Sequence, residues 1–138
     1  MRPVTSISVF IILLMSLLSG CGVRSGNLVK EYNDFGVKCA KMGLWNEAIM
    51  RWKRVVEIEP DNAPAHNNLG VAYESKGNFG AAMAEYKIAL ELDPDNKVYM
   101  SNYSKFKKNY ERVRKRNKTQ NTMSKFEDLG IGTSTNEK

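Results

Sequence analysis

The residues that could support catalysis or metal binding are few and lie far apart in this sequence. His66 is the only histidine among 138 residues, and the two cysteines are Cys21 and Cys39. A zinc site needs three or four histidine and cysteine ligands at short spacing, and these residues do not provide such a set. We therefore expect no metal site and no cofactor, and we interpret His66 and Cys39 as packing residues.

Carboxylates that could act as an acid-base pair occur twice, as Glu57 with Glu59 and as Asp93 with Asp95. Each pair stands beside a proline at the end of an apolar segment, where acidic residues usually belong to turns. No glycine-rich segment precedes a helix with a lysine placed to hold a phosphate, and no nucleophile turn is present. The sequence therefore predicts no catalytic residues, and it favours a binding protein over an enzyme.

The elements that carry these residues form an internal repeat of 34 residues. Residues 29–62 align with residues 63–96, and the non-identical pairs keep their size and character. A fixed period of this length is typical of stacked repeats that present a binding surface. The identical pairs include Asn33 and Asn67, Gly36 and Gly70, Gly43 and Gly77, Ala48 and Ala82, and Pro60-Asp61-Asn62 and Pro94-Asp95-Asn96.

Apolar residues recur at a spacing of three and four in each unit, which predicts two amphipathic helices per unit. In the first helix this spacing places Leu28, Tyr32, Phe35 and Cys39 on one inner face. Because one hairpin cannot bury both of its apolar faces alone, we expect the two hairpins to pack against each other.

Start and stop residues give the expected limits of these helices. Gly43 and Gly77 are expected to end the first helix of each unit, since glycine adopts the left-handed conformation without a Cβ clash. Asn46 and Asn62 are candidate N-caps for the helices that follow. Pro60 prevents the second helix from continuing.

The two units resemble the tetratricopeptide repeat family, and the resemblance covers residues 29–96. It implies an all-α fold in which two helical hairpins begin a right-handed α-α superhelix, with close helix approaches at Gly36, Gly70, Ala48 and Ala82. Cys39 and Val55 depart from the usual tyrosine and alanine of the pattern. The matching residues are Phe35, Gly36, Gly43, Ala48, Trp52 and Pro60 in unit 29–62, and Leu69, Gly70, Tyr73, Gly77, Ala82, Tyr86, Ala89 and Pro94 in unit 63–96.

A basic amphipathic helix is predicted over residues 97–118, with Asn96 as its N-cap, and it would cap the stack. Its apolar stripe consists of Tyr99, Tyr103, Phe106, Tyr110 and Val113. Its many lysines and arginines indicate either a solvated face or a contact with an acidic partner or anionic lipid. Residues 119–138 lack periodicity, which predicts a disordered tail; a short docking motif of Phe126, Leu129 and Ile131 is the alternative.

The N-terminal residues 1–20 are predicted to be a signal peptide. Arg2 precedes an apolar stretch from Ile7 to Leu18, which is shorter than the roughly 20 residues of a membrane-spanning helix. The residues Leu18-Ser19-Gly20-Cys21 resemble the lipobox of bacterial lipoproteins. This resemblance implies that Cys21 becomes an acylated N-terminus, with chains such as palmitate holding the protein on a membrane.

The resemblance to lipoproteins also gives an expected location and a linker. Residues 21–28 would form the lipidated N-terminus and a short extended linker. Because Gly22 and not aspartate follows Cys21, the sorting rule of Gram-negative lipoproteins implies the periplasmic face of the outer membrane. In this compartment of the cell envelope we expect no nucleic acid partner.

The resemblance to tetratricopeptide repeats places partners along the concave face formed by the first helix of each unit. We expect Asn33 and Asn67 to hydrogen-bond the backbone of an extended peptide, because an amide both donates and accepts. Val37 stands where the chaperone-binding members need asparagine, so that specificity is not expected. The positions implied are Lys30, Asn33, Val37, Lys41, Asn67, Val71, Glu74 and Ser75, extended by Ser101, Lys105 and Lys108 of the cap helix.

Two functions follow from these expectations. The first is a lipid-anchored adaptor that docks a segment of another envelope protein, as pilotins and envelope-assembly lipoproteins of this kind do. The second is a structural lipoprotein whose basic helix contacts anionic lipid or cell wall. Self-association is left open by the sequence.

Overall fold

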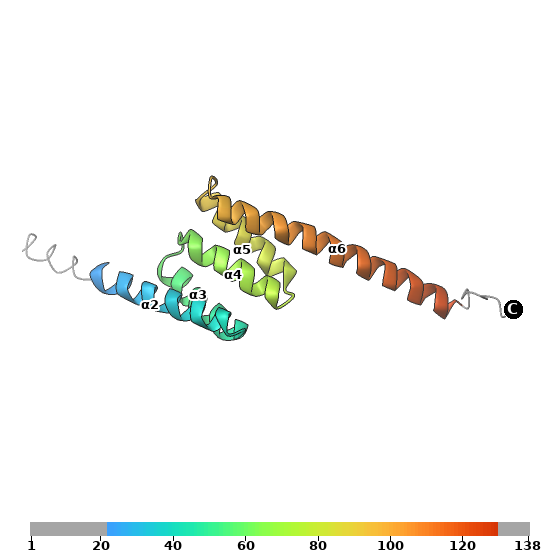
Figure 1. The fold of residues 1–138 in the computed structure, drawn as a ribbon, viewed down its shortest axis with the longest axis horizontal. Coiled ribbons are helices and arrows are strands. Elements are labelled where there is room, and N and C mark those ends of the chain that lie inside the picture. Colours follow the sequence, from blue (N-terminus) through green and yellow to red (C-terminus); the bar gives the residue numbers. More distant parts are fainter. Residues whose placement is uncertain (1–21, 130–138) are drawn as a thin grey trace, which may run out of the picture.

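The computed structural model describes residues 22–129, and they fold into five helices with no strand among them. The helices are α2 (Gly22–Lys41), α3 (Trp45–Ile58), α4 (Ala63–Ser75), α5 (Phe79–Leu92) and α6 (Lys97–Asp128). Two hairpins, α2–α3 and α4–α5, pack against each other, and α6 packs on the second hairpin (Figure 1). This confirms the all-α prediction. The predicted signal peptide, Cys21 and the segment from Gly130 onward, with Ile131, lie outside the described residues.

The turn inside each hairpin has the same geometry in both repeats. Gly43 and Gly77 adopt φ angles of +74° and +72°, as predicted for glycines that end a helix. In both turns the next amide reaches back to the preceding helix, from Leu44 N to Cys39 O and from Asn78 N to Tyr73 O, at 2.9 Å each. The repeat is therefore reproduced at the level of individual backbone hydrogen bonds.

Two of the predicted N-caps are confirmed, and one is wrong. The Asn62 side chain accepts from Ala65 N at 3.0 Å, and the Asn96 side chain accepts from Val98 N and Tyr99 N. Asn46 instead lies inside α3, which begins at Trp45 with Leu44 at the cap position. The tight turn at Gly43 starts the helix earlier than the position of the asparagine suggests.

The turns that follow α3 and α5 use the acidic residues described above. The Asn62 amide donates to Glu59 Oε2 at 2.8 Å, and the Asn96 amide donates to Asp93 Oδ2 at 2.9 Å. Since Asn62 and Asn96 also cap the next helix, each asparagine ties the end of one helix to the start of another. This confirms that Glu59 and Asp93 belong to turns.

The core of each hairpin is an aromatic ring packed on a glycine of the facing helix. A Cβ added to Gly36 would lie 2.7 Å from Trp52 Nε1, and one added to Gly70 would lie 2.7 Å from Tyr86 Cδ1. The rings fill the space that a side chain would need, which confirms the predicted close approach. Cys39 is buried in the same cluster as Trp52 and Leu69, so its packing role is also confirmed.

The predicted inner face of α2 is only partly correct. Leu28 is 41% exposed and Phe35 is 45% exposed, whereas Val29 is buried. The face that packs is centred on Gly36 instead. Within the described residues no helix precedes α2 to cover Leu28 and Phe35, and a side of the helix that would be internal in a longer stack faces solvent.

The first half of α6 caps the second repeat as predicted. Phe106 is fully buried, and its ring lies 5.3 Å from that of Tyr86 and 6.0 Å from that of Tyr110, between centroids. Such aromatic contacts add to the apolar area that the helix buries. Tyr99 is buried against Ala63 and Ala89 at the start of the helix.

Both ends of the helical region extend further than predicted. α6 continues to Asp128 and projects past the repeats, so residues 119–128 are helical and not a disordered tail (Figure 1). No glycine or proline interrupts residues 97–129, and the loss of apolar periodicity alone does not end a helix. α2 begins at Gly22, so the extended linker predicted within residues 21–28 is also wrong.

Candidate partner-binding groove

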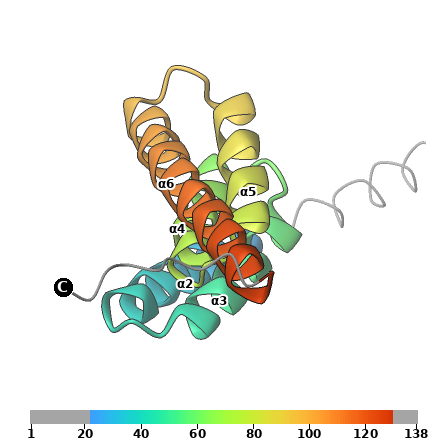
Figure 2. The same cartoon turned by 90° about the vertical axis from the view of Figure 1, so that its right-hand side faces the viewer.

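The first helices of the repeats, α2 and α4, and the cap helix α6 succeed one another as one row (Figure 2). Side-chain amides join neighbouring helices: Asn68 Nδ2 donates to Asn33 Oδ1 at 3.5 Å, and Asn102 Nδ2 donates to Asn67 Oδ1 at 3.0 Å. The second contact is the first one moved along by a full repeat. The beginning of α6 therefore occupies the place of the first helix of a third repeat.

A second polar contact fixes α6 to α4 and α5 at the same time. Glu74 accepts from the Tyr86 hydroxyl at 3.0 Å through Oε2 and from Asn109 Nδ2 at 3.3 Å through Oε1. Burial of the hydroxyl, together with the charge of Glu74, raises the pKa of Tyr86 well above its ordinary value of 10.0. The Tyr86 hydroxyl therefore stays neutral across the physiological pH range and donates a hydrogen bond to Glu74.

The structure distributes the predicted groove residues over three levels of exposure. Asn67 alone among them is buried, and those on the surface lie on all three helices of the row. The half-buried residues are Asn33, Val37, Val71 and Glu74, and the exposed residues are Lys30, Lys41, Ser75, Ser101, Lys105 and Lys108.

Asn67 does not have the role that the sequence suggests for it. It is only 6% exposed, and its carbonyl oxygen already accepts the hydrogen bond from Asn102. Asn33 is similarly engaged through its oxygen by Asn68. The expectation that Asn67 binds a peptide backbone is therefore wrong, because the cap helix covers it. The sequence does contain a signal for this contact, since Asn68 aligns with Asn102 one period later.

The two valines of the predicted groove belong to the packing beneath it. Val71 packs against the cluster of Ala82, Tyr86 and Phe106, and Val37 packs against the cluster that contains Cys39. These contacts hold the row of helices in place. A partner would meet the exposed polar residues at its surface.

The exposed part of the row is cationic. Lys30, Lys41, Lys105 and Lys108 contribute four ammonium groups from α2 and α6. Lys30 lies 2.6 Å from Asp34, and this hydrogen bond raises the pKa of Lys30, although both groups are solvated and the pair is weak. Within residues 22–129 no group of acidic, histidine and cysteine side chains could hold a metal ion, and none of the helices is long and apolar enough to cross a membrane.

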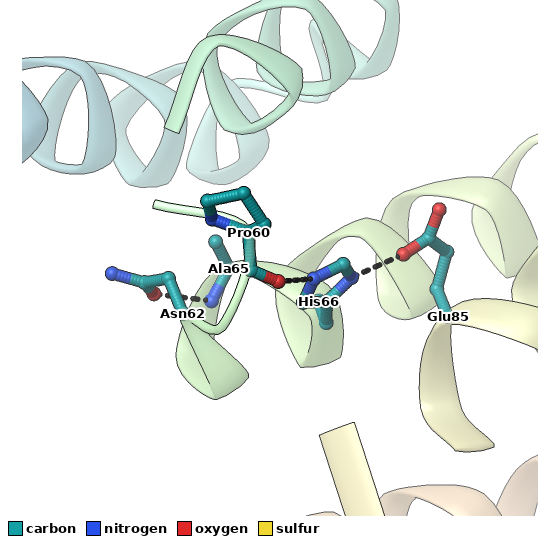
Figure 3. Close-up of polar contacts among 5 residues, drawn as sticks. All are labelled: Pro60, Asn62, Ala65, His66 and Glu85. Atoms are coloured by element: carbon teal, nitrogen blue, oxygen red, sulfur yellow. Dashed lines mark hydrogen bonds and ion pairs between the residues drawn. The ribbon is translucent and has the colours of Figure 1, made fainter. Parts of the chain in front are cut away.

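His66 lies between the turn that precedes α4 and a side chain of α5 (Figure 3). Its Nε2 lies 2.9 Å from Pro60 O, and its Nδ1 lies 2.7 Å from Glu85 Oε2. The carbonyl and the carboxylate are both acceptors, so a ring nitrogen that carries a proton can donate to its neighbour. The ring is 8% exposed and joins the turn before α4 to α5, which confirms that His66 is a packing residue.

Two surface depressions lie on the free side of the first hairpin, away from most of the predicted groove. One of about 450 Å³ is lined by α2 and includes Lys30, Asp34 and Phe35, and one of about 380 Å³ is lined by residues that include Met50 and Arg51 of α3. Of the predicted site residues, only Lys30 lies in this region. The sequence feature that could have indicated the region is a difference between aligned residues, since Arg51 stands where the second repeat has Glu85.

Comparisons with known proteins support the repeat assignment. Residues 36–77 match the family model described as TPR repeat, and residues 63–96 match the model described as tetratricopeptide repeat. Tetratricopeptide repeats are thus present in residues 36–96. No curated protein matches the sequence.

One solved structure that resembles this chain is a mutant O-GlcNAc transferase from Thermobaculum terrenum. The TM-score is 0.58 with 26% sequence identity over 60% of this chain. The match spans only 16% of the transferase chain, so the likeness concerns a part of that protein.

Proposed function

We propose that this protein is an adaptor that binds a segment of another protein on the surface of α2, α4 and α6. Tetratricopeptide repeats generally bind protein partners, and two of them are present here. The observation that carries the proposal is the row of exposed lysines on helices that are locked together below the surface. A rigid charged surface costs little ordering entropy when a partner binds.

The partner segment should be acidic and extended. Lys105 and Lys108 are exposed one turn apart on α6, and Lys41 lies at the end of α2. Cations arranged in this way attract carboxylates and raise the rate of encounter. Two repeats and half of a third offer a small interface, so we expect a Kd on the order of micromolar.

We further propose that the adaptor is a lipoprotein held in the bacterial cell envelope through acyl chains on Cys21. The support is the sequence Leu18-Ser19-Gly20-Cys21 after an apolar segment of signal-peptide length. Residence at the periplasmic face of the outer membrane would place the groove near envelope assemblies, in a role similar to that of pilotins. The Cys21→Ser variant should lose both metabolic labelling by an alkyne fatty acid and sedimentation with membranes.

A photoreactive amino acid at Ser101 tests the adaptor function in living cells. Ser101 is exposed in the row and, unlike Asn67, makes no contact that holds the fold among those described above. Crosslinking should capture a protein through an acidic segment, and Lys105→Glu with Lys108→Glu should reduce the captured amount at least about fivefold. Lys87→Glu, an equally exposed change on α5, should have no effect.

Equal loss of capture in the Lys87→Glu control would contradict binding in the groove. A second candidate function then gains support, in which α6 contacts anionic lipid or cell wall. The observation that favours it is the run of exposed basic residues Arg112, Arg114, Lys115, Arg116 and Lys118 on the projecting half of the helix. In that case the Cys21→Ser protein should sediment with anionic vesicles but not with neutral ones.

A further inference from the structure

The free side of the first repeat retains an apolar surface that the second repeat buries. Phe35 is 45% exposed, whereas Leu69 at the aligned position is 1% exposed and lies in one cluster with Ile49 and Val56 of α3. Inside the molecule, the position of Leu69 is thus covered by apolar residues of the preceding helix, α3. At Phe35 the described residues provide no helix of this kind.

This surface has a basic wall. The Arg51 guanidinium carbon lies 4.6 Å from the centroid of the Phe35 ring and 5.8 Å from that of Tyr32. Phe35 lines the depression of about 450 Å³, Arg51 lines the one of about 380 Å³, and Met50, which also lines the second, is 57% exposed. Lys53 and Arg54 line the second depression, so the surface combines exposed aromatic and aliphatic area with cationic side chains.

The end of α6 combines exposed apolar side chains with acidic ones. Met123, Phe126 and Leu129 are 58%, 49% and 62% exposed, and the acidic Glu127 and Asp128 stand between the last two. Phe126 follows Phe106 by twenty residues, so it points about 160° away from the buried stripe around the helix axis. The apolar residues of the end therefore do not continue the surface that faces the repeats of the same chain.

We propose that the C-terminal end of α6, residues 119–129, docks on the α2–α3 surface of a second copy of this chain. Phe126 and Met123 cover Phe35, while Glu127, which lies about 40° from Met123 around the helix axis, faces the side of Arg51 and Lys53. The apolar side chains of the two surfaces are exposed in a single chain, and Glu127 is opposite in charge to Arg51 and Lys53, whereas Arg54 is paired with Glu57. The docked helix occupies the position that α3 has relative to α4.

The second copy follows from the geometry of α6. The helix has no glycine or proline between residues 97 and 129, and its end projects beyond the repeats and away from α2 (Figure 1). It cannot fold back onto its own first repeat without breaking. Two copies can exchange their ends reciprocally, or copies can join head to tail, because the two surfaces involved are different. This proposal does not depend on the groove or on its partner.

Photocrosslinking between two differently tagged full-length copies tests the proposal. A photoreactive amino acid at Phe126 should crosslink one copy to the other, and mass spectrometry should place the crosslink in residues 27–57. Asn121 is exposed on the same segment but points about 140° away from Phe126 around the helix axis, and the same amino acid there should give little product. Arg51→Glu in the receiving copy should lower the yield from Phe126 at least about fivefold.

Several results would overturn the proposal. They are capture of only lipid or only another protein from Phe126, a crosslink to the second copy outside residues 27–57, absence of any product, and equal yields from Asn121 and Phe126. Misfolding does not confuse the test, because Phe126 and Asn121 are exposed and the melting temperature of each variant can be compared with that of the original chain.

Discussion

The two repeats place different residue pairs at the same aligned positions. In the first repeat Trp52 packs on Gly36, and Ala40 stands where the second repeat has Glu74. In the second repeat the ring on glycine is Tyr86, and its hydroxyl donates to Glu74. The hydroxyl of the second repeat is paired with a carboxylate, whereas the buried Trp52 Nε1 has no hydrogen-bond partner among the described residues. The shape of the hairpin is therefore kept without the polar contact.

A second pair of positions shows the same relation. Arg51 lies over the ring of Tyr32, and the aligned residues in the second repeat are Glu85 and His66, which form a hydrogen bond. Both pairs join the first helix of a repeat to its second helix. One is a cation over a ring at a partly open end of the stack, and the other is a hydrogen bond between two mostly buried side chains. The helices that pack on a repeat thus determine which side-chain contacts form at its aligned positions.

The largest effect expected from this comparison concerns Leu69 and Phe35. Leu69→Ala should reduce the free energy of unfolding by about 3 kcal/mol, because it leaves a cavity between the repeats. Phe35→Ala should cost less than about 1 kcal/mol, since the ring already faces solvent in a single chain. Urea denaturation at micromolar protein concentration measures both. Equal losses would mean that Phe35 is covered in solution.

A smaller loss is expected where an aromatic ring meets glycine. Gly70→Ala should destabilise the protein by about 2 kcal/mol, because its Cβ would lie 2.7 to 2.9 Å from three atoms of the Tyr86 ring. Gly36→Ala should act in the same direction through Trp52. A Cβ added to Gly80 would meet nothing within 4 Å, so Gly80→Ala should stabilise α5 by up to about 1 kcal/mol. A destabilised Gly80→Ala protein, or a neutral Gly70→Ala protein, would contradict this account.

Much of this architecture is readable from the sequence because it depends on local rules. Glycine at a positive φ angle, an asparagine cap and a period of 34 residues each have a single simple cause, and the structure confirms Gly43, Gly77 and Asn62 in those roles. The cap helix was also predictable, since its aromatic stripe must cover something.

What the sequence could not supply depends on neighbours in space. Asn67 has the same type as Asn33, yet α6 buries it, and the only sequence signal for that contact is the alignment of Asn68 with Asn102 one period later. Phe35 has the apolar character of a core residue, but the first repeat lacks a preceding helix within the described residues. The end of α6 was missed for another reason, because its helix persists without an apolar stripe facing the repeats.

The matched pairs can be exchanged between repeats to test whether they act as units. Either His66→Tyr or Glu85→Arg alone should cost about 1 to 2 kcal/mol, because each leaves the remaining partner without its hydrogen bond. The double variant, which copies Tyr32 and Arg51 into the second repeat, should recover part of that loss. A double-mutant cycle by urea denaturation gives the coupling energy. If the two losses in free energy of unfolding simply add, the two residues of the pair are not energetically coupled.

The smallest expected effect is a loss of folding stability that begins only above about pH 10. Burial and the charge of Glu74 raise the pKa of Tyr86, and burial with the charge of Asp93 raises that of Tyr99, both from an ordinary 10.0. The unfolded chain therefore loses these protons first. The stabilisation is present below pH 10 and is lost as the pH rises above it.

Tyr86→Phe separates this contribution from the rest of the alkaline unfolding. The variant loses a hydrogen bond at every pH, so its free energy of unfolding at pH 7 should be about 1 kcal/mol lower than that of the original chain. Above pH 10 its stability should fall less steeply, because one of the two buried hydroxyls no longer ionises. Urea titrations from pH 8 to pH 11 measure both quantities. Parallel curves for the variant and the original chain would show that Tyr86 ionises equally in the folded and unfolded states, and the contact with Glu74 would then have no part in holding α4 to α5.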